Sequence, residues 1–96
     1  MLQINAQSKI KRLGNISWKE MEDESVLLDL GSGNYFSTNP VGLFIWKSLN
    51  GRAMVEKIAR RLAAKFDVRQ EMALKDTLAF INKLEGLGLV ALQDKL

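Results

Sequence analysis

The sequence predicts a small α+β domain of order βββααα, in which a three-stranded antiparallel sheet packs with three helices. Two observations carry this prediction. Between residues 16 and 38 apolar side chains alternate with polar ones, as in half-buried strands. From residue 39 onward they recur at helical spacing instead. A chain of 96 residues that is 47% hydrophobic and 26% charged has the balance of one globular domain.

Three strands are expected in the first half of the chain. The segments 16–21 and 25–30 are separated by the acidic residues 22–24, which are typical of a solvated turn. Residues 31–34 read Gly-Ser-Gly-Asn and predict a tight hairpin turn, because Gly and Asn accept the positive φ values that such turns require. Residues 35–38 then form a third strand at an edge of the sheet, with one side unpaired unless something covers it.

Three helices follow the strands. Thr38 or Asn39 can cap the first helix, and Pro40 suits its first turn, where a backbone N–H would be unpaired anyway. Gly51 and Gly88 are stop signals for the first and third helices. The expected helices are residues 40–49, 53–65 and 70–87, and a short strand or extended tail follows at residues 89–92.

The N-terminal residues are polar and lack a sustained period. We therefore expect a flexible arm over residues 1–14 and a single domain over residues 15–92. No apolar run approaches the roughly 20 residues that span a bilayer, and the N-terminus lacks the apolar core of a secretory signal. The sequence predicts a cytoplasmic protein with no membrane partner.

The composition argues against catalysis. The chain contains no cysteine and no histidine, which excludes thiolate metal sites, cysteine nucleophiles and the usual general base. The glycines of residues 31–34 lack the lysine of a phosphate-binding loop, and the acidic residues 22–24 lack the spacing of a calcium loop. We expect no catalytic residue, no metal site and no cofactor, so the remaining question is what the domain binds.

A winged-helix DNA-binding regulator is the alternative interpretation, because such domains also combine three helices with a small sheet. The basic surplus lies within residues 51–68. The third helix and its lead-in, which would enter the DNA groove, carry as many acidic as basic side chains. A helix pressed against phosphates should not bring carboxylates with it, which argues against a nucleic-acid partner. The balanced charges are Arg69, Lys75 and Lys83 against Glu71, Asp76 and Glu85.

The third helix carries a wider apolar arc than one neighbour covers. Leu74 and Leu78 fall on one edge of this arc, beside polar residues that include Lys75. An exposed strand edge next to an apolar helix shoulder is the geometry for β-augmentation, in which a partner peptide adds a strand to the sheet.

The order of these features resembles the coenzyme PQQ synthesis protein D family and the related RiPP recognition elements, including the small recognition proteins of lasso-peptide pathways. The resemblance covers about residues 16–90. Its segments are Val26–Thr38 with the glycine turn inside it, Asn39, Val41-Gly42, Ile45-Trp46, Leu49-Asn50-Gly51, Val55–Ile58, Phe66-Asp67-Val68, Asp76, Phe80-Ile81, Leu84 and Gly88-Leu89-Val90.

This resemblance implies a winged helix-turn-helix-like βββααα domain without catalytic activity. It implies a peptide chaperone that binds the leader segment of a ribosomally made precursor peptide and presents it to a modifying enzyme, such as a radical SAM protein or a leader peptidase. We expect a monomer or a weak dimer. The peptide-binding residues that the resemblance implies are Asn34, Tyr35, Phe36, Ser37, Thr38, Leu74, Lys75 and Leu78.

Overall fold

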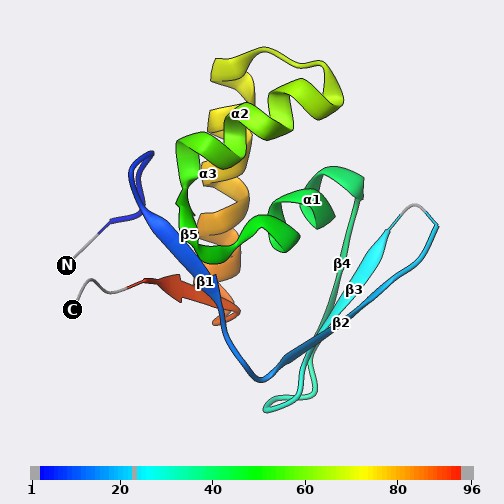
Figure 1. Cartoon of the computed structure of the whole chain (residues 1–96). Coiled ribbons are helices and arrows are strands. Elements are labelled where there is room, and N and C mark those ends of the chain that lie inside the picture. The colour runs from blue at the N-terminus through cyan, green and yellow to red at the C-terminus, as the bar shows by residue number, and fades with distance from the viewer. Residues whose placement is uncertain (1–2, 23, 94–96) are drawn as a thin grey trace.

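Two small antiparallel sheets and three helices build the domain (Figure 1). The computed structural model describes residues 3–22 and 24–93. One sheet has the order β2-β3-β4 and the other the order β5-β1-β6. The strands are β1 (Lys9–Arg12), β2 (Ile16–Glu20), β3 (Ser25–Asp29), β4 (Tyr35–Thr38), β5 (Asn50–Met54) and β6 (Val90–Leu92), and the helices are α1 (Pro40–Ser48), α2 (Val55–Phe66) and α3 (Gln70–Gly86).

The α+β class and the meander β2-β3-β4 with three helices are confirmed. Residues 31–34 join β3 to β4, and Gly33 has the positive φ of 79° that the turn requires. The cap of α1 is Asn39, whose side-chain oxygen accepts a hydrogen bond from the backbone N–H of Gly42 at 2.8 Å. Pro40 occupies the first turn of that helix, as expected.

The N-terminal segment differs from the flexible arm that we expected. Residues Lys9–Arg12 form β1, the central strand of the second sheet, between β5 and β6. The Ile10 side chain is 1% exposed and belongs to the hydrophobic core. Both strand partners lie far along the chain, so the short polar pattern around Ile10 did not reveal the pairing.

The second helix begins two residues later than expected. Ala53 and Met54 belong to β5 rather than to α2, and Gly51 in that strand has a φ of 79°. Residues 90–92 form the strand β6, which is one of the two conformations expected for residues 89–92. This strand pairs with β1 in antiparallel register. The second sheet therefore combines strands from the early (β1), middle (β5) and late (β6) parts of the sequence.

The core lies where the three helices meet β1, β3 and β6. Trp46 of α1 is fully buried, and the guanidinium carbon of Arg12 lies 5.8 Å from the centre of its ring. Leu27 is the fully buried core residue that β3 contributes. Among residues 3–22 and 24–93, none of the helices combines the length and the hydrophobicity that a membrane span requires.

Candidate functional site

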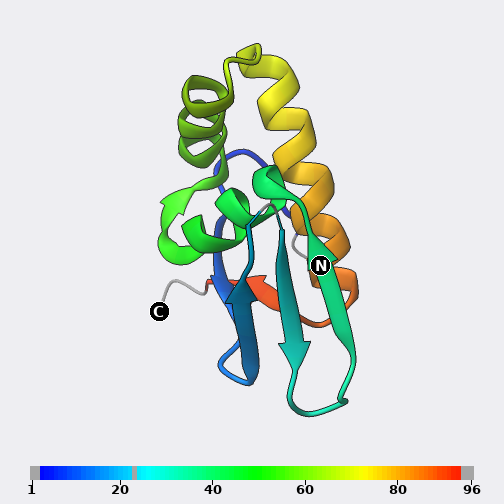
Figure 2. The same ribbon diagram turned by 90° about the vertical axis from the view of Figure 1, so that its right-hand side faces the viewer.

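Strand β4 has one open edge. Within residues 3–22 and 24–93 it pairs with β3 alone, and it forms the margin of the β2-β3-β4 sheet. Figure 2 shows this margin beside α3, on the side of the sheet away from β2. An edge strand presents a row of unpaired backbone donors and acceptors, so it is a template for another extended chain.

The register identifies which backbone groups face outward. The N–H of Asp29 donates to the carbonyl oxygen of Asn34 at 2.9 Å, which makes these two residues a hydrogen-bonded pair. Pairing alternates along an antiparallel ladder, so the backbones of Phe36 and Thr38 also face β3. The backbone N–H and C=O groups of Tyr35 and Ser37 therefore point toward the open edge.

A hollow of about 440 Å³ lies next to this edge, between β4, the start of α1 and one face of α3. We call it the β4–α3 groove. Apolar and polar side chains both border it, and α3 contributes one aromatic ring and two opposite charges. Its lining residues are Ser37, Thr38, Asn39, Val41, Gly42, Ile45, Asp76, Phe80 and Lys83.

The floor of the groove depends on a close approach between α1 and α3. A Cβ atom on Gly42 would lie 3.1 Å from Cζ of Phe80 and 3.2 Å from Cβ of Thr38. Glycine at this position therefore lets the Phe80 ring pack against α1. Thr38 is held from the other side by a hydrogen bond between its hydroxyl and that of Ser25.

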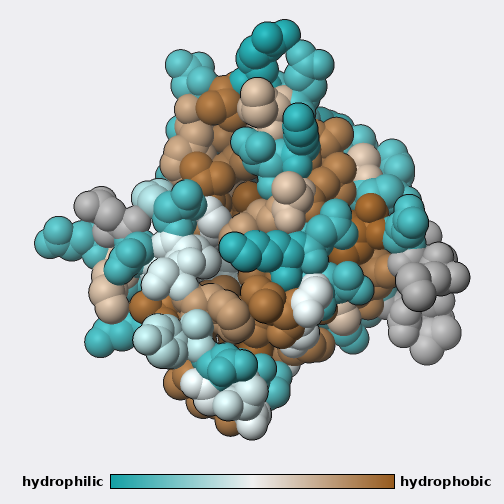
Figure 3. Space-filling view, turned by 180° about the vertical axis from the view of Figure 1, so that it is seen from behind, coloured by the Kyte–Doolittle hydropathy of each residue, from teal (hydrophilic) through white to brown (hydrophobic). Residues whose placement is uncertain are grey.

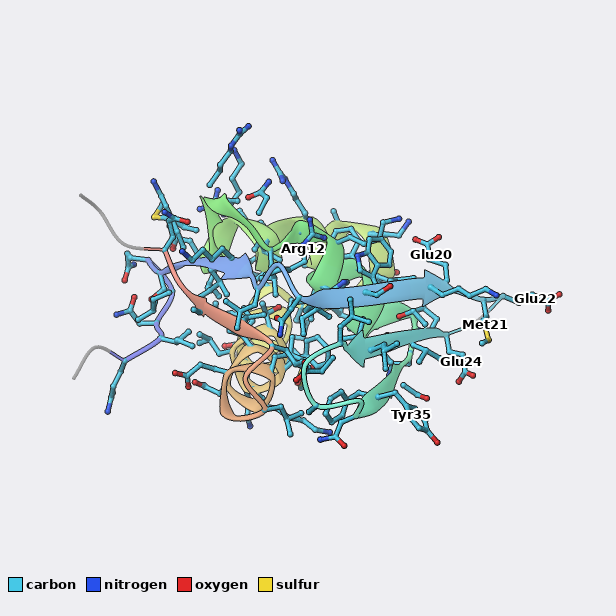
Figure 4. The ribbon with its side chains drawn as sticks, turned by 90° about the horizontal axis from the view of Figure 1, so that it is seen from below. Arg12, Glu20, Met21, Glu22, Glu24 and Tyr35 are labelled. Carbon is cyan, nitrogen blue, oxygen red and sulfur yellow. The ribbon has the colours of Figure 1, made fainter. Side chains whose placement is uncertain are left out.

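The predicted β4 residues lie along the open edge with different exposures. The side chain of Tyr35 is 71% exposed on the outer face of the sheet, where Figure 4 shows it pointing away from the helices. Asn34 and Ser37 are exposed as well, whereas Phe36 is half-buried and Thr38 is buried. Ser37 and Thr38 are the members of this group that line the β4–α3 groove.

The predicted α3 residues lie elsewhere on that helix. Leu74 and Leu78 are half-buried and pack against the hydrophobic core. Lys75 borders a separate hollow together with Arg69, Glu71 and Met72. The structure does not bring these three residues to the groove beside β4. The α3 residues that border it are Asp76, Phe80 and Lys83, which recur at helical spacing on the opposite edge of the apolar arc.

Acidic side chains gather at one hairpin tip away from the groove. Glu20, Glu22 and Glu24 gather with Met21 at the tip of the β2–β3 hairpin (Figure 4), while Asp23 lies outside the described residues. No group of three or more Asp, Glu, His or Cys residues in the described ranges is placed to hold a metal ion.

Figure 3 shows hydrophobic surface exposed in hollows between hydrophilic side chains on the rear face of the molecule.

The fold and the groove define a class of small α+β domain in which a three-stranded sheet keeps an open edge next to the longest helix. The sequence profile of coenzyme PQQ synthesis protein D (PqqD) matches residues 24–90. The chain belongs to this family. Comparison with curated protein sequences gave no significant match.

Three solved structures share the fold. The structure described as TbiB1 in complex with the TbiA(beta) leader peptide is 28% identical, with a TM-score of 0.75 over 90% of this chain and 98% of that chain. A lasso peptide synthetase B1 complexed with the leader peptide is 24% identical, with a TM-score of 0.77 over 88% and 99%. The PqqD truncation of Methylobacterium extorquens PqqCD, described as a stand-alone RiPP recognition element, is 18% identical, with a TM-score of 0.78 over 92% and 94%.

Proposed function

We propose that this protein binds the leader segment of a ribosomally synthesised precursor peptide and presents it to a modifying enzyme, without catalysing a reaction itself. The observation that carries the proposal is the open edge of β4 beside the β4–α3 groove. The leader adds a strand to β4 and places alternate side chains over α3. The two similar structures that hold leader peptides support this role for the family fold.

Backbone pairing alone does not hold the peptide. Ordering about five peptide residues costs roughly 5–10 kcal/mol. Tyr35 and Ser37 each offer one donor and one acceptor at the edge, and net hydrogen bonds to these groups return about 2–6 kcal/mol. Apolar peptide side chains must supply the remainder, at roughly 1.5–3 kcal/mol each when buried. Phe80 and Val41 provide the apolar surface for them.

Ser37 offers a direct test of strand addition. Its N–H faces the open edge, so Ser37→Pro removes a donor from the peptide side of β4 and leaves the ladder with β3 intact. The variant should fold normally and bind peptide about three- to tenfold more weakly, since one net hydrogen bond is worth about 0.5–1.5 kcal/mol. Ser37→Ala is the matched control, because it loses the hydroxyl but keeps the N–H, and it should bind peptide more tightly than Ser37→Pro.

Any short precursor gene that genome sequencing finds beside the gene of this protein supplies the ligand for this test, as a synthetic leader segment. Titration of the ¹⁵N-labelled chain should move the amide signals of β4 and of the α3 residues that border the groove. Affinity should fall at most severalfold as salt rises, whereas binding to DNA falls steeply over the same range. Equal peptide affinity of Ser37→Pro and wild type, with both folded, would rule out strand addition at β4.

A further inference from the structure

Two opposite charges stand at the two ends of the β4–α3 groove. Asp76 and Lys83 are exposed on α3 and border the groove on either side of Phe80 in sequence. The ion pairs found among the described residues join Lys47 to Glu20, Arg60 to Glu56 and Arg69 to Glu71. Asp76 and Lys83 take part in none of these, so both charges are available to a ligand.

The fold gives these charges a direction relative to β4. In Figures 1 and 2, β4 and α3 run in opposite directions. Phe80 packs at Gly42, next to Thr38 at the end of β4. Asp76 precedes Phe80 by about one helical turn and lies toward the start of α1. Lys83 follows Phe80 by about one turn and lies toward the start of β4.

An added strand most favourably runs antiparallel to β4. Antiparallel pairs are more stable per residue than parallel pairs, and the existing sheet is antiparallel throughout. A peptide antiparallel to β4 runs in the same direction as α3. Its N-terminal end then lies near Asp76 and its C-terminal end near Lys83.

The spacing of the two charges sets a pattern for the peptide. Seven residues of helix rise about 10.5 Å, which corresponds to roughly three residues of strand at about 3.4 Å each. Side chains on one face of a strand recur every second residue, so long side chains four positions apart reach both charges. The position midway between them faces the Phe80 ring.

We propose that the β4–α3 groove selects leader peptides containing the pattern basic-x-apolar-x-acidic, read from N- to C-terminus. This assignment rests on the proposed function and adds the charge order and direction of the bound segment. Asp76 receives the basic side chain, Phe80 receives the apolar side chain and Lys83 receives the acidic one. Each exposed pair contributes modestly, and the correct charge order binds roughly three- to thirtyfold more tightly than the reversed order.

The test uses a display library of random twelve-residue peptides and two forms of the full chain. Peptides are selected on the wild type after removal of those that also bind Ser37→Pro, which leaves binders that depend on the β4 edge. The same selection is made on the charge-swapped variant Asp76→Lys/Lys83→Glu, which keeps the net charge. We expect the basic-x-apolar-x-acidic order on the wild type and the reversed order on the swapped variant.

A second charge swap on the same helix is the matched control. Glu71→Lys/Lys75→Glu exchanges two exposed charges outside the groove, and peptides selected on it should keep the wild-type order. A selection that leaves no edge-dependent peptide would overturn the proposed function. Edge-dependent peptides without a charge order, or with the acidic residue first on the wild type, would overturn the charge assignment and leave strand addition standing.

Discussion

Ser25 and Thr38 hold β4 against β3 from the buried side of the sheet. Their hydroxyl groups hydrogen-bond to each other across a directly opposed pair of residues, and both side chains are buried. Thr38 also borders the β4–α3 groove. This pair therefore connects the stability of the sheet to the position of the strand that we propose as the peptide template.

Removing both hydroxyls should cost less than the sum of the costs of removing each one alone. Ser25→Ala leaves the Thr38 hydroxyl buried without this partner, and we expect a loss of about 1–3 kcal/mol in the free energy of unfolding. The double variant Ser25→Ala/Thr38→Val replaces both partners and should lose less than the sum of the two single changes. Urea unfolding measures Ser25→Ala, Thr38→Val and the double variant. Strictly additive losses would show that the two hydroxyls do not act as a pair.

At the residue scale, local signatures predicted the edge strand over residues 35–38, and the family resemblance implied Asn34–Thr38 as peptide-binding residues. Ser37 and Thr38 border the groove, and peptide binding by this segment stays a prediction. The α3 side was harder to predict. The apolar arc of this helix has two edges, and periodicity does not say which edge faces α2 and which faces β4. Phe80 between two opposite charges was the available signal for the groove edge.

The residue that caps the C-terminus of α2 has an energetically unfavourable backbone conformation. Asp67 is the one non-glycine residue with positive φ in the described part of the chain, at φ 54° and ψ 50°. The left-handed conformation disfavours side chains with a Cβ, and a carboxylate at a helix C-terminus opposes the helix dipole. The position thus favours glycine.

Asp67→Gly should stabilise the domain. We expect a gain of about 0.5–1 kcal/mol in the free energy of unfolding and a rise of a few degrees in Tm. Asp67→Ala is the control, because it removes the charge but keeps the Cβ, and it should not reproduce the gain. Thermal unfolding followed by circular dichroism compares them. A Tm for the glycine variant at or below that of the wild type would contradict the strain at this helix end.

At the element scale, local signals predicted the three helices and the β2-β3-β4 meander with small errors at their ends. The second sheet was not predicted, because its pairing is non-local. β1 takes its hydrogen-bond partners from β5 and β6, and neither partner is a neighbour of β1 in sequence. A four-residue strand with one buried side chain has too little alternation to be recognised by pattern alone.

The whole molecule depends on β1 more than the polar N-terminus suggests. Ile10→Ala should lower the free energy of unfolding by about 2–5 kcal/mol, because a large buried side chain is lost from the core. Lys9→Ala is the exposed control on the same strand and should stay within about 0.5 kcal/mol of the wild type. Urea unfolding gives both values.

A chain that begins at residue 14 provides the stronger version of this test. It lacks the central strand of the β5-β1-β6 sheet, so β5 and β6 lose their common partner. We expect it to give the poorly dispersed amide spectrum of an unfolded protein. A well-dispersed spectrum with wild-type Tm would mean that β1 is dispensable.

The pairing of β1 with β6 also sets an order for biosynthesis. Ile10 pairs with Leu92, far along the chain, so the β5-β1-β6 sheet is completed only when β6 has left the ribosome. The β3–β4 hairpin needs only its own neighbours and forms among the first elements. A nascent chain therefore displays the unpaired edge of β4 before α3 has been made, and it can discriminate between peptides only after α3 has packed beside that edge.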